Sequence, residues 1–196
     1  MPTDAYEVWG VTPDLWTPEQ TTNAILAVLN AGVDRVIVRE RRLTVQIRHT
    51  IVQGVLAHGV APHRVLLRLG SDDPSPPAGW SVHLADGVPR PSSEPSFVSA
   101  TVHSTSRLRS DVDVLVAAPF ASPRSKHSTT TPLGIGGLHR IVAASSRPVL
   151  ALGGITNTNA SQAVAAGAVG VAAISAVFLD GEPSLGVLLE RVRPPR

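Results

Sequence analysis

The chain has 196 residues, of which 43% are hydrophobic and 16% are charged, and its net charge is +2. This composition excludes a disordered protein, and the small charge without a Lys/Arg run argues against a nucleic-acid partner. The chain contains no cysteine. Disulfides, a thiol nucleophile and a Cys-ligated metal are therefore excluded.

The N-terminal segment MPTDAYEVW lacks the charged-then-apolar pattern of a signal peptide. No apolar run reaches the ~20 residues that span a bilayer. We therefore expect a soluble cytoplasmic protein without a membrane partner. Because no linker or change of composition divides the chain, we expect residues 1–196 to form a single domain.

Short β-branched runs alternate with helical patterns, which is typical of βα units on a parallel sheet. The expected strands are 6–12, 35–40, 64–69, 81–85, 97–103, 113–118, 149–153 and 170–175. The expected helices are one from Thr17 to Gly32, one over 43–59, a short one after the fifth strand, and those over 135–145, 159–166 and 184–192. Thr17 suits an N-cap, and Gly32 and Gly59 lie where a helix end favours a left-handed residue.

The third and fourth connections break this pattern. Their sequences, SDDPSPPAGW and GVPRPSSEPS, are too short and too rich in proline for a helix. We therefore predict a (β/α)₈ TIM barrel, of class α/β, in which loops or single turns replace the third and fourth helices. An open, doubly wound sheet is the alternative. The paired carboxylates Asp72 and Asp73 are expected to be solvated in the first of these loops.

Loops at the carboxyl ends of the strands form the binding site in this fold, and those after strands seven and eight commonly bind phosphate. Gly153 and Gly154 allow a ligand to approach backbone amides, and Ser175 adds a hydroxyl. This pattern predicts a phosphate site, although the glycines can also serve only a tight turn. After strand two, Arg39 and Arg41 suit a phosphate or pyrophosphate, unless they pair with Glu40 or lie on the surface with Arg42.

Polar residues of the long loop after strand six, Ser125, Lys126 and His127, belong either to a lid or binding segment or to a disordered flap. His103 and His83 stand at strand ends, where an imidazole can act as an acid or base near neutral pH. A structural, hydrogen-bonded role is the alternative for both. No spacing typical of a metal site occurs.

Several segments, taken in order, resemble the thiamin phosphate synthase and TenI family of barrels. The resemblance lies in VIVRER, SVHLADG, ATVHS, DVLVAAPFASPRSK and, above all, the stretch PLGIGGLHRIVAASSRPVLALGGITNTNASQAVAAGAVGVAAISAVF. In the synthase, such a barrel joins a pyrimidine diphosphate to a thiazole phosphate, with magnesium on the departing pyrophosphate. The resemblance implies that Arg39, Arg41, Ser125 and Lys126 hold pyrophosphate, and that Gly153, Gly154, Ile174 and Ser175 hold the thiazole phosphate.

The chain departs from the synthase pattern at the magnesium ligands. Arg68 and Leu69 stand where the synthase has Asn-Asp after strand three, and Val88 stands at the second acidic ligand. Ile37 replaces the Gln of strand two. We therefore expect no metal site and no cofactor.

The segments VRER and VHS are closer to TenI-like members, some of which are tautomerases of thiazole phosphate carboxylate. The histidine of TenI's sixth strand falls on Pro119, which leaves His103 or His127 for acid/base chemistry, and we assign His103. The expected function is thus a TenI-like isomerase. The alternatives are a thiamin phosphate synthase with a rebuilt metal site, and a non-catalytic protein that binds thiazole or thiamin phosphate. An apolar side left by the shortened third and fourth units would favour a homodimer.

Overall fold

The computed structural model describes residues 6–122 and 131–193 and consists of eight parallel strands closed into a barrel in the order β1 to β8. The strands are β1 (Glu7–Val11), β2 (Arg35–Val38), β3 (Val65–Leu69), β4 (Ser81–Leu84), β5 (Phe97–Val102), β6 (Val114–Ala117), β7 (Val149–Leu152) and β8 (Gly170–Ala173). The barrel closes where β1 pairs with β8, with Trp9 beside Ala172. The predicted TIM barrel is confirmed, and the open-sheet alternative is wrong.

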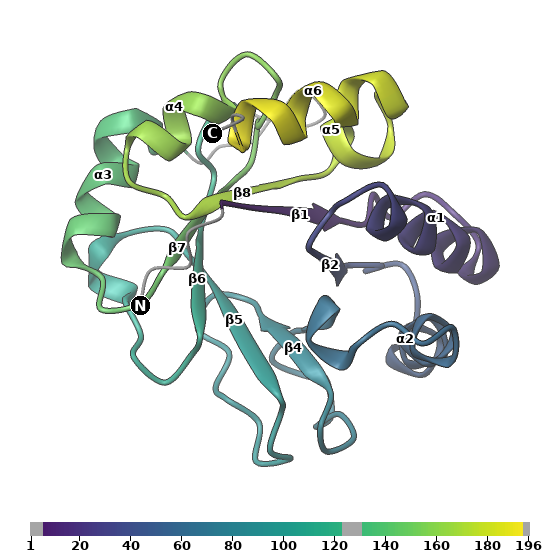
Figure 1. Ribbon diagram of the computed structural model, residues 1–196. Helices are drawn as coiled ribbons and strands as arrows, with labels where there is room; N and C mark the ends of the chain where they lie inside the picture. The colour runs from purple at the N-terminus through teal and green to yellow at the C-terminus, as the bar shows by residue number, and fades with distance from the viewer. Residues whose placement is uncertain (1–5, 123–130, 194–196) are drawn as a thin grey trace.

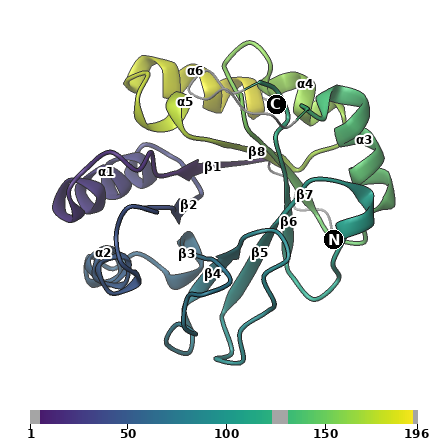
Figure 2. The same cartoon turned by 180° about the vertical axis from the view of Figure 1, so that it is seen from behind.

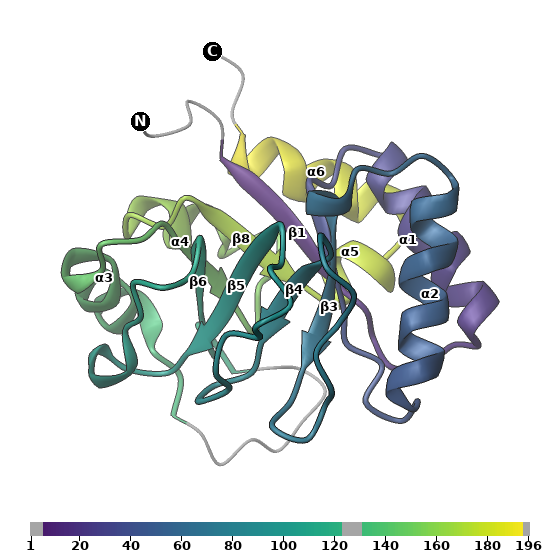
Figure 3. The same ribbon diagram turned by 90° about the horizontal axis from the view of Figure 1, so that it is seen from below.

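The helices lie outside this ring (Figure 1). They are α1 (Pro18–Asn30), α2 (Val45–Ala57), α3 (Gly134–Ala144), α4 (Ala160–Ala165), α5 (Ser175–Phe178) and α6 (Glu182–Val192), with the 3₁₀ turns η1 (Pro62–Arg64) and η2 (Thr105–Arg107). Helices α1 and α2 pack side by side on one flank, and α3 and α4 lie on the other (Figure 3). None of the helices formed by the described residues has the length and apolar character needed to cross a membrane.

Local sequence signals begin and end the first two helices as predicted. Thr17 forms a capping box with Gln20, in which each side chain accepts a hydrogen bond from the other residue's backbone amide. Thr44 caps α2 by accepting from the amide of Ile47. Gly32 and Gly59 follow the two helices with φ of +106° and +80°, a conformation that glycine adopts without steric strain.

No α-helix connects β3, β4, β5 and β6 in the part of the chain that the structure describes, and this sector of the ring is bordered by loops (Figure 2). The loops predicted for the third and fourth units are confirmed. The outward side chains of Val82, Leu84, Val98 and Val102 are nevertheless fully buried. Loop residues such as Val88 pack against them, because apolar strand faces must be covered even without helices.

This covering removes the basis for an apolar dimer face in that sector. The exposed large hydrophobic side chains among the described residues lie elsewhere, at Tyr6, Leu15, Ile47, Ile135, Leu179 and Val187. A homodimer therefore stays a prediction without support from the shortened units.

Several predicted boundaries and one predicted element are wrong. Strand β2 ends at Val38, so the arginines that follow lie in a loop. A 3₁₀ turn, η2, replaces the short helix expected in the segment 103–113 between β5 and β6. Ser175 does not end the eighth strand but begins the short helix α5, and α6 starts at Glu182, where Pro183 occupies the first turn.

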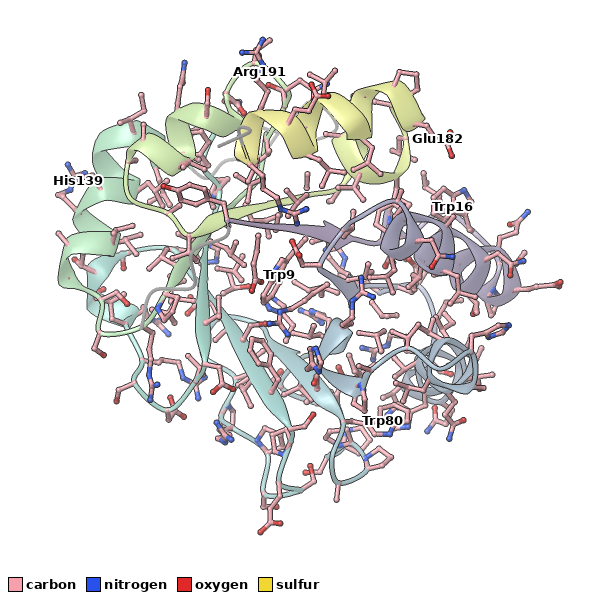
Figure 4. The ribbon with its side chains drawn as sticks, viewed as in Figure 1. Trp9, Trp16, Trp80, His139, Glu182 and Arg191 are labelled. Carbon is pink, nitrogen blue, oxygen red and sulfur yellow. The ribbon has the colours of Figure 1, made fainter. Side chains whose placement is uncertain are left out.

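The barrel interior is a small apolar cluster that includes Trp9, Val11, Ile37, Leu66 and Leu150. Trp9 lies among the strands in the middle of the molecule (Figure 4). Its indole lies 6.0 Å from the ring of Phe97, and the guanidinium of Arg35 is 5.5 Å from the indole centroid. Arg35 also pairs with Glu7 at the first residue of β1, so this group closes the N-terminal end of the barrel and leaves the carboxyl-terminal mouth for a site.

Candidate functional site

The two glycines predicted to bind phosphate follow β7 directly. Gly153 and Gly154 have φ of +95° and +64°. A Cβ on Gly153 would lie 2.9 Å from Pro119 Cα, and one on Gly154 would lie 2.6 Å from the carbonyl oxygen of Ala121. The tight packing of the β6 and β7 loops therefore requires both glycines, irrespective of any ligand.

The same packing leaves backbone donors available. The amides of Ala121 and Phe120 donate to the carbonyls of Gly153 and Leu152, whereas the amides of Gly153 and Gly154 donate to no described residue. The side chain of Asn159 holds the loop by donating to the Gly154 carbonyl at 2.8 Å. Free amides held in a rigid loop are suited to an oxyanion.

Ile174 and Ser175 lie beside this loop on the neighbouring strand. The register of β7 and β8 pairs Leu152 with Ala172, which places Gly154 next to Ile174. Ser175 opens α5, and neither its hydroxyl nor its amide donates to a described residue. The structure thus brings together Gly153, Gly154, Ile174 and Ser175, as the sequence predicts.

The arginines that follow β2 form the second predicted group. Arg39 continues the inward face of Ile37, and Arg41 lines a cavity of about 470 Å³ at the mouth. Glu40 is not their partner: its side chain is 1% exposed, one carboxylate oxygen accepts from the Asp14 amide, and the other has no partner. Burial raises the pKa of Glu40 above its ordinary value.

The nearest acidic group to these arginines is Asp14. It lies 4.0 Å from the guanidinium of Arg41 and 3.3 Å from that of Arg42, whose side chain is largely exposed. Within the described residues, no carboxylate lies within 4 Å of the Arg39 guanidinium. Burial, and then the nearby Arg41, lower the pKa of Arg39.

Arg68 is a site residue that the sequence analysis did not assign. It faces the interior because Leu66, two residues earlier, belongs to the interior cluster, and its Cα pairs with that of His83 on β4. Its side chain lines the same cavity as Arg41. Burial lowers the pKa of Arg68, as do the nearby Arg48 and Arg41, whereas the charge of Asp73 acts in the opposite direction. Alternation along β3 could have indicated this position, since it is the only charged residue of that strand.

Three carboxylates line this cavity: Asp72 is exposed to solvent, and Asp73 and Asp86 have arginine neighbours. Asp73 binds Arg48 at 2.6 Å and also accepts from the amide of Gly70, so its expected solvation is wrong. Arg48 also donates to the Arg68 carbonyl, and the pair therefore fixes the loop after β3. Asp86 lies 4.0 Å from Arg107.

The side chains around this cavity do not fit the magnesium ion that the thiamin phosphate synthase pattern implies. No three Asp, Glu or His side chains within residues 6–122 and 131–193 are arranged to hold a metal. The end of β3 presents the guanidinium of Arg68 to the mouth, and Val88 presents an apolar side chain. A guanidinium repels a divalent cation, and Mg²⁺ requires oxygen ligands.

His83 is a buried part of the barrel wall. Its Nδ1 and Nε2 lie 2.8 Å and 2.9 Å from the hydroxyls of Ser99 and Thr101. Burial, together with the charge of Arg68, lowers the pKa of His83 to about 3. The imidazole is therefore neutral at physiological pH, and both nitrogens are engaged, which favours the structural role for this residue.

His103 is exposed at the carboxyl end of β5. Its Nδ1 lies 2.6 Å from the carbonyl oxygen of Ala118. Because a carbonyl only accepts, Nδ1 carries the proton, and Nε2 of the neutral ring is left with a free lone pair. This geometry suits a general base at the carboxyl end of β5. Ser125 and Lys126 lie outside the described residues.

An eight-stranded parallel barrel, with backbone amides and guanidiniums at the carboxyl-terminal mouth, places the protein among the TIM-barrel proteins that carry their site at that end. A family model described as thiamine monophosphate synthase matches residues 95–177. The predicted resemblance to the thiamin phosphate synthase and TenI family is therefore confirmed.

Individual relatives agree with this result. Thiamine-phosphate synthase of Methanoregula boonei is 34% identical over 114 residues, which are 53% of this chain and 52% of that protein. The synthase of Albidiferax ferrireducens is 31% identical over 110 residues, 56% of this chain and 43% of that protein. The matches thus span about half the length of these curated relatives.

A solved structure extends the likeness in fold over nearly the whole chain. The thiamine phosphate pyrophosphorylase from Pyrococcus furiosus superposes with a TM-score of 0.72 at 20% identity and covers 95% of both chains.

Proposed function

We propose that the protein condenses a pyrimidine diphosphate with a thiazole phosphate to give thiamin phosphate. The observation that carries this proposal is the presence of two groups suited to anions at one mouth. Amides and a hydroxyl after β7 and β8 form one group, and guanidiniums after β2 and on β3 form the other. In a ring of eight strands, β3 stands opposite β7. Two anionic substrates can therefore bind face to face.

The names of the relatives also support a synthase rather than the expected TenI-like tautomerase. A tautomerase acts on one phosphorylated substrate, whose second anionic group is a single carboxylate, whereas several guanidiniums suit the higher charge of a diphosphate. In the proposed assignment, Gly153, Gly154, Ile174 and Ser175 hold the thiazole phosphate. Arg39 and Arg41, together with Ser125 and Lys126, hold the diphosphate.

The test is formation of thiamin phosphate from both substrates, measured once with magnesium and once with a chelator. Arg39→Met removes one charge-assisted hydrogen bond and is expected to raise KM for the diphosphate substrate alone by about tenfold. Ser175→Ala removes one neutral hydrogen bond and is expected to raise KM for the thiazole phosphate alone by about tenfold. Absence of thiamin phosphate under both conditions would contradict the proposal.

The Nε2 of His103, which has no partner among the described residues, favours a second candidate, the tautomerase that relocates a proton on thiazole phosphate carboxylate. Aromatisation of that compound, lost in His103→Gln with binding retained, would establish this activity. Tight binding of either thiazole compound without any turnover would instead indicate a binding protein.

A further inference from the structure

Three guanidiniums gather on one side of the mouth. We call Arg39, Arg41 and Arg68 the arginine cluster. Arg41 and Arg68 line the same cavity, and burial together with the charges of both lowers the pKa of Arg39, against the opposing charge of Asp14. The side chains of Arg39 and Arg68 donate to no acceptor within the described part of the chain. Asp14, at 4.0 Å from Arg41, is the nearest carboxylate to the cluster.

The charges of Asp14 and Asp73 offset this arrangement only in part, because Asp14 also pairs with Arg42 and Asp73 is bound to Arg48. Partly buried like charges repel one another, and burial removes the water that would otherwise screen them. A diphosphate relieves both effects, because it brings several negative charges and accepts paired hydrogen bonds from guanidinium groups. The cluster therefore has the chemistry of a site for a multiply charged phosphate.

The position of Arg68 distinguishes this site from the magnesium-dependent pattern of thiamin phosphate synthases. Arg68 stands at the end of β3 where the synthase has Asn-Asp, and it is held beside His83 by the strand register. Asp73 is bound to Arg48, and Asp72 and Asp86 join no group of three acidic or histidine side chains within the described residues that could hold a metal ion.

We propose that the arginine cluster, with Arg68 as its new member, takes the place of the divalent cation, so that the diphosphate is bound and leaves without a metal. This inference rests on the proposed synthase function. In the condensation, the thiazole nitrogen forms a bond to the methylene carbon of the pyrimidine. The bond from that carbon to the diphosphate oxygen breaks, its electron pair departs with the pyrophosphate, and no proton is transferred. Fixed guanidiniums stabilise the charge that develops on the departing oxygen.

The first experiment is calorimetric titration of the full chain with inorganic pyrophosphate, in EDTA and in magnesium chloride. Binding in EDTA is expected to be as tight as in magnesium or tighter, because magnesium in solution neutralises part of the pyrophosphate charge. Binding at least tenfold tighter with magnesium would overturn the inference. This measurement does not depend on turnover, so absence of thiamin phosphate would count against the proposed function alone.

A variant series tests Arg68 itself. Arg68→Met is expected to weaken pyrophosphate binding in EDTA by about 10- to 100-fold, the loss of one charge-assisted contact. Arg68→Lys should restore part of the affinity, because it keeps the charge but not the planar fork. Arg42→Met is the matched control: Arg42 lies outside the cavity, and its side chain is 60% exposed. Equal affinity of Arg68→Met and Arg42→Met, with both folded by circular dichroism, would overturn the assignment.

Discussion

The buried imidazole of His83 makes a quantitative prediction about pH and stability. The folded chain lowers its pKa from 6.5 to about 3, whereas the unfolded chain leaves it near the ordinary value. The unfolded state therefore takes up a proton first as the pH falls, and acid favours unfolding from about pH 6.5 downward until the effect is complete near pH 3. Between pH 7 and pH 5 this histidine alone should lower the free energy of unfolding by about 2 kcal/mol.

His83→Gln removes this titration and keeps a hydrogen-bonding side chain between the hydroxyls of Ser99 and Thr101. The variant is expected to be less stable than the parent chain at pH 7 but to lose about 2 kcal/mol less between pH 7 and pH 5. Urea unfolding followed by tryptophan fluorescence at both pH values measures the difference. Equal losses in the two proteins would refute the reasoning, as would an NMR titration in which the His83 ring protonates above pH 5.

Three further predictions concern stability, each measured by urea unfolding. Arg48→Leu breaks the pair with Asp73, whose side chains are 7% and 17% exposed, and should lower the free energy of unfolding by about 3 kcal/mol or more. Arg42→Leu breaks a pair in which the arginine is exposed and should lower it by less than about 1 kcal/mol. Similar losses in the two variants would contradict the burial argument. Gly154→Ala should lower the free energy of unfolding by at least about 2 kcal/mol, because the added Cβ clashes and φ is unfavourable for alanine. Gly59→Ala should lower it by only about 1 kcal/mol, because nothing lies within 4 Å of the added Cβ. The reverse order would be incompatible with the described packing. Thr17→Ala removes the capping box of α1 and should cost about 1 kcal/mol, and an unchanged midpoint would mean that the cap contributes nothing.

The sequence alone predicted the class of fold and the residues that lie together after β7 and β8. Alternation of β-branched runs with helical patterns is a local property, and it determined all eight strands and their order. The proline-rich segments after β3 and β4 correctly indicated loops, because proline disrupts helices irrespective of tertiary context. Gly153, Gly154 and Ser175 were assigned correctly to one place because adjacent parallel strands end at the same edge.

The sequence misassigned features that depend on contacts between distant segments. Asp73 was expected in solvent, but α2 carries Arg48 to it, 25 residues away along the chain. The reason for two glycines after β7 also lies in another loop, whose backbone leaves no room for a Cβ.

The arginine cluster and the neutral state of His83 were decided only by the tertiary structure. Nothing in the neighbouring residues of Arg68 shows that it will lie beside a histidine from another strand, or that Arg39 and Arg41 will share its side of the mouth. Local patterns determine which segments become strands, since they follow from propensity and periodicity. Charge, burial and pKa are set by the closed barrel, because it brings together side chains from strands far apart in the sequence and removes water from between them.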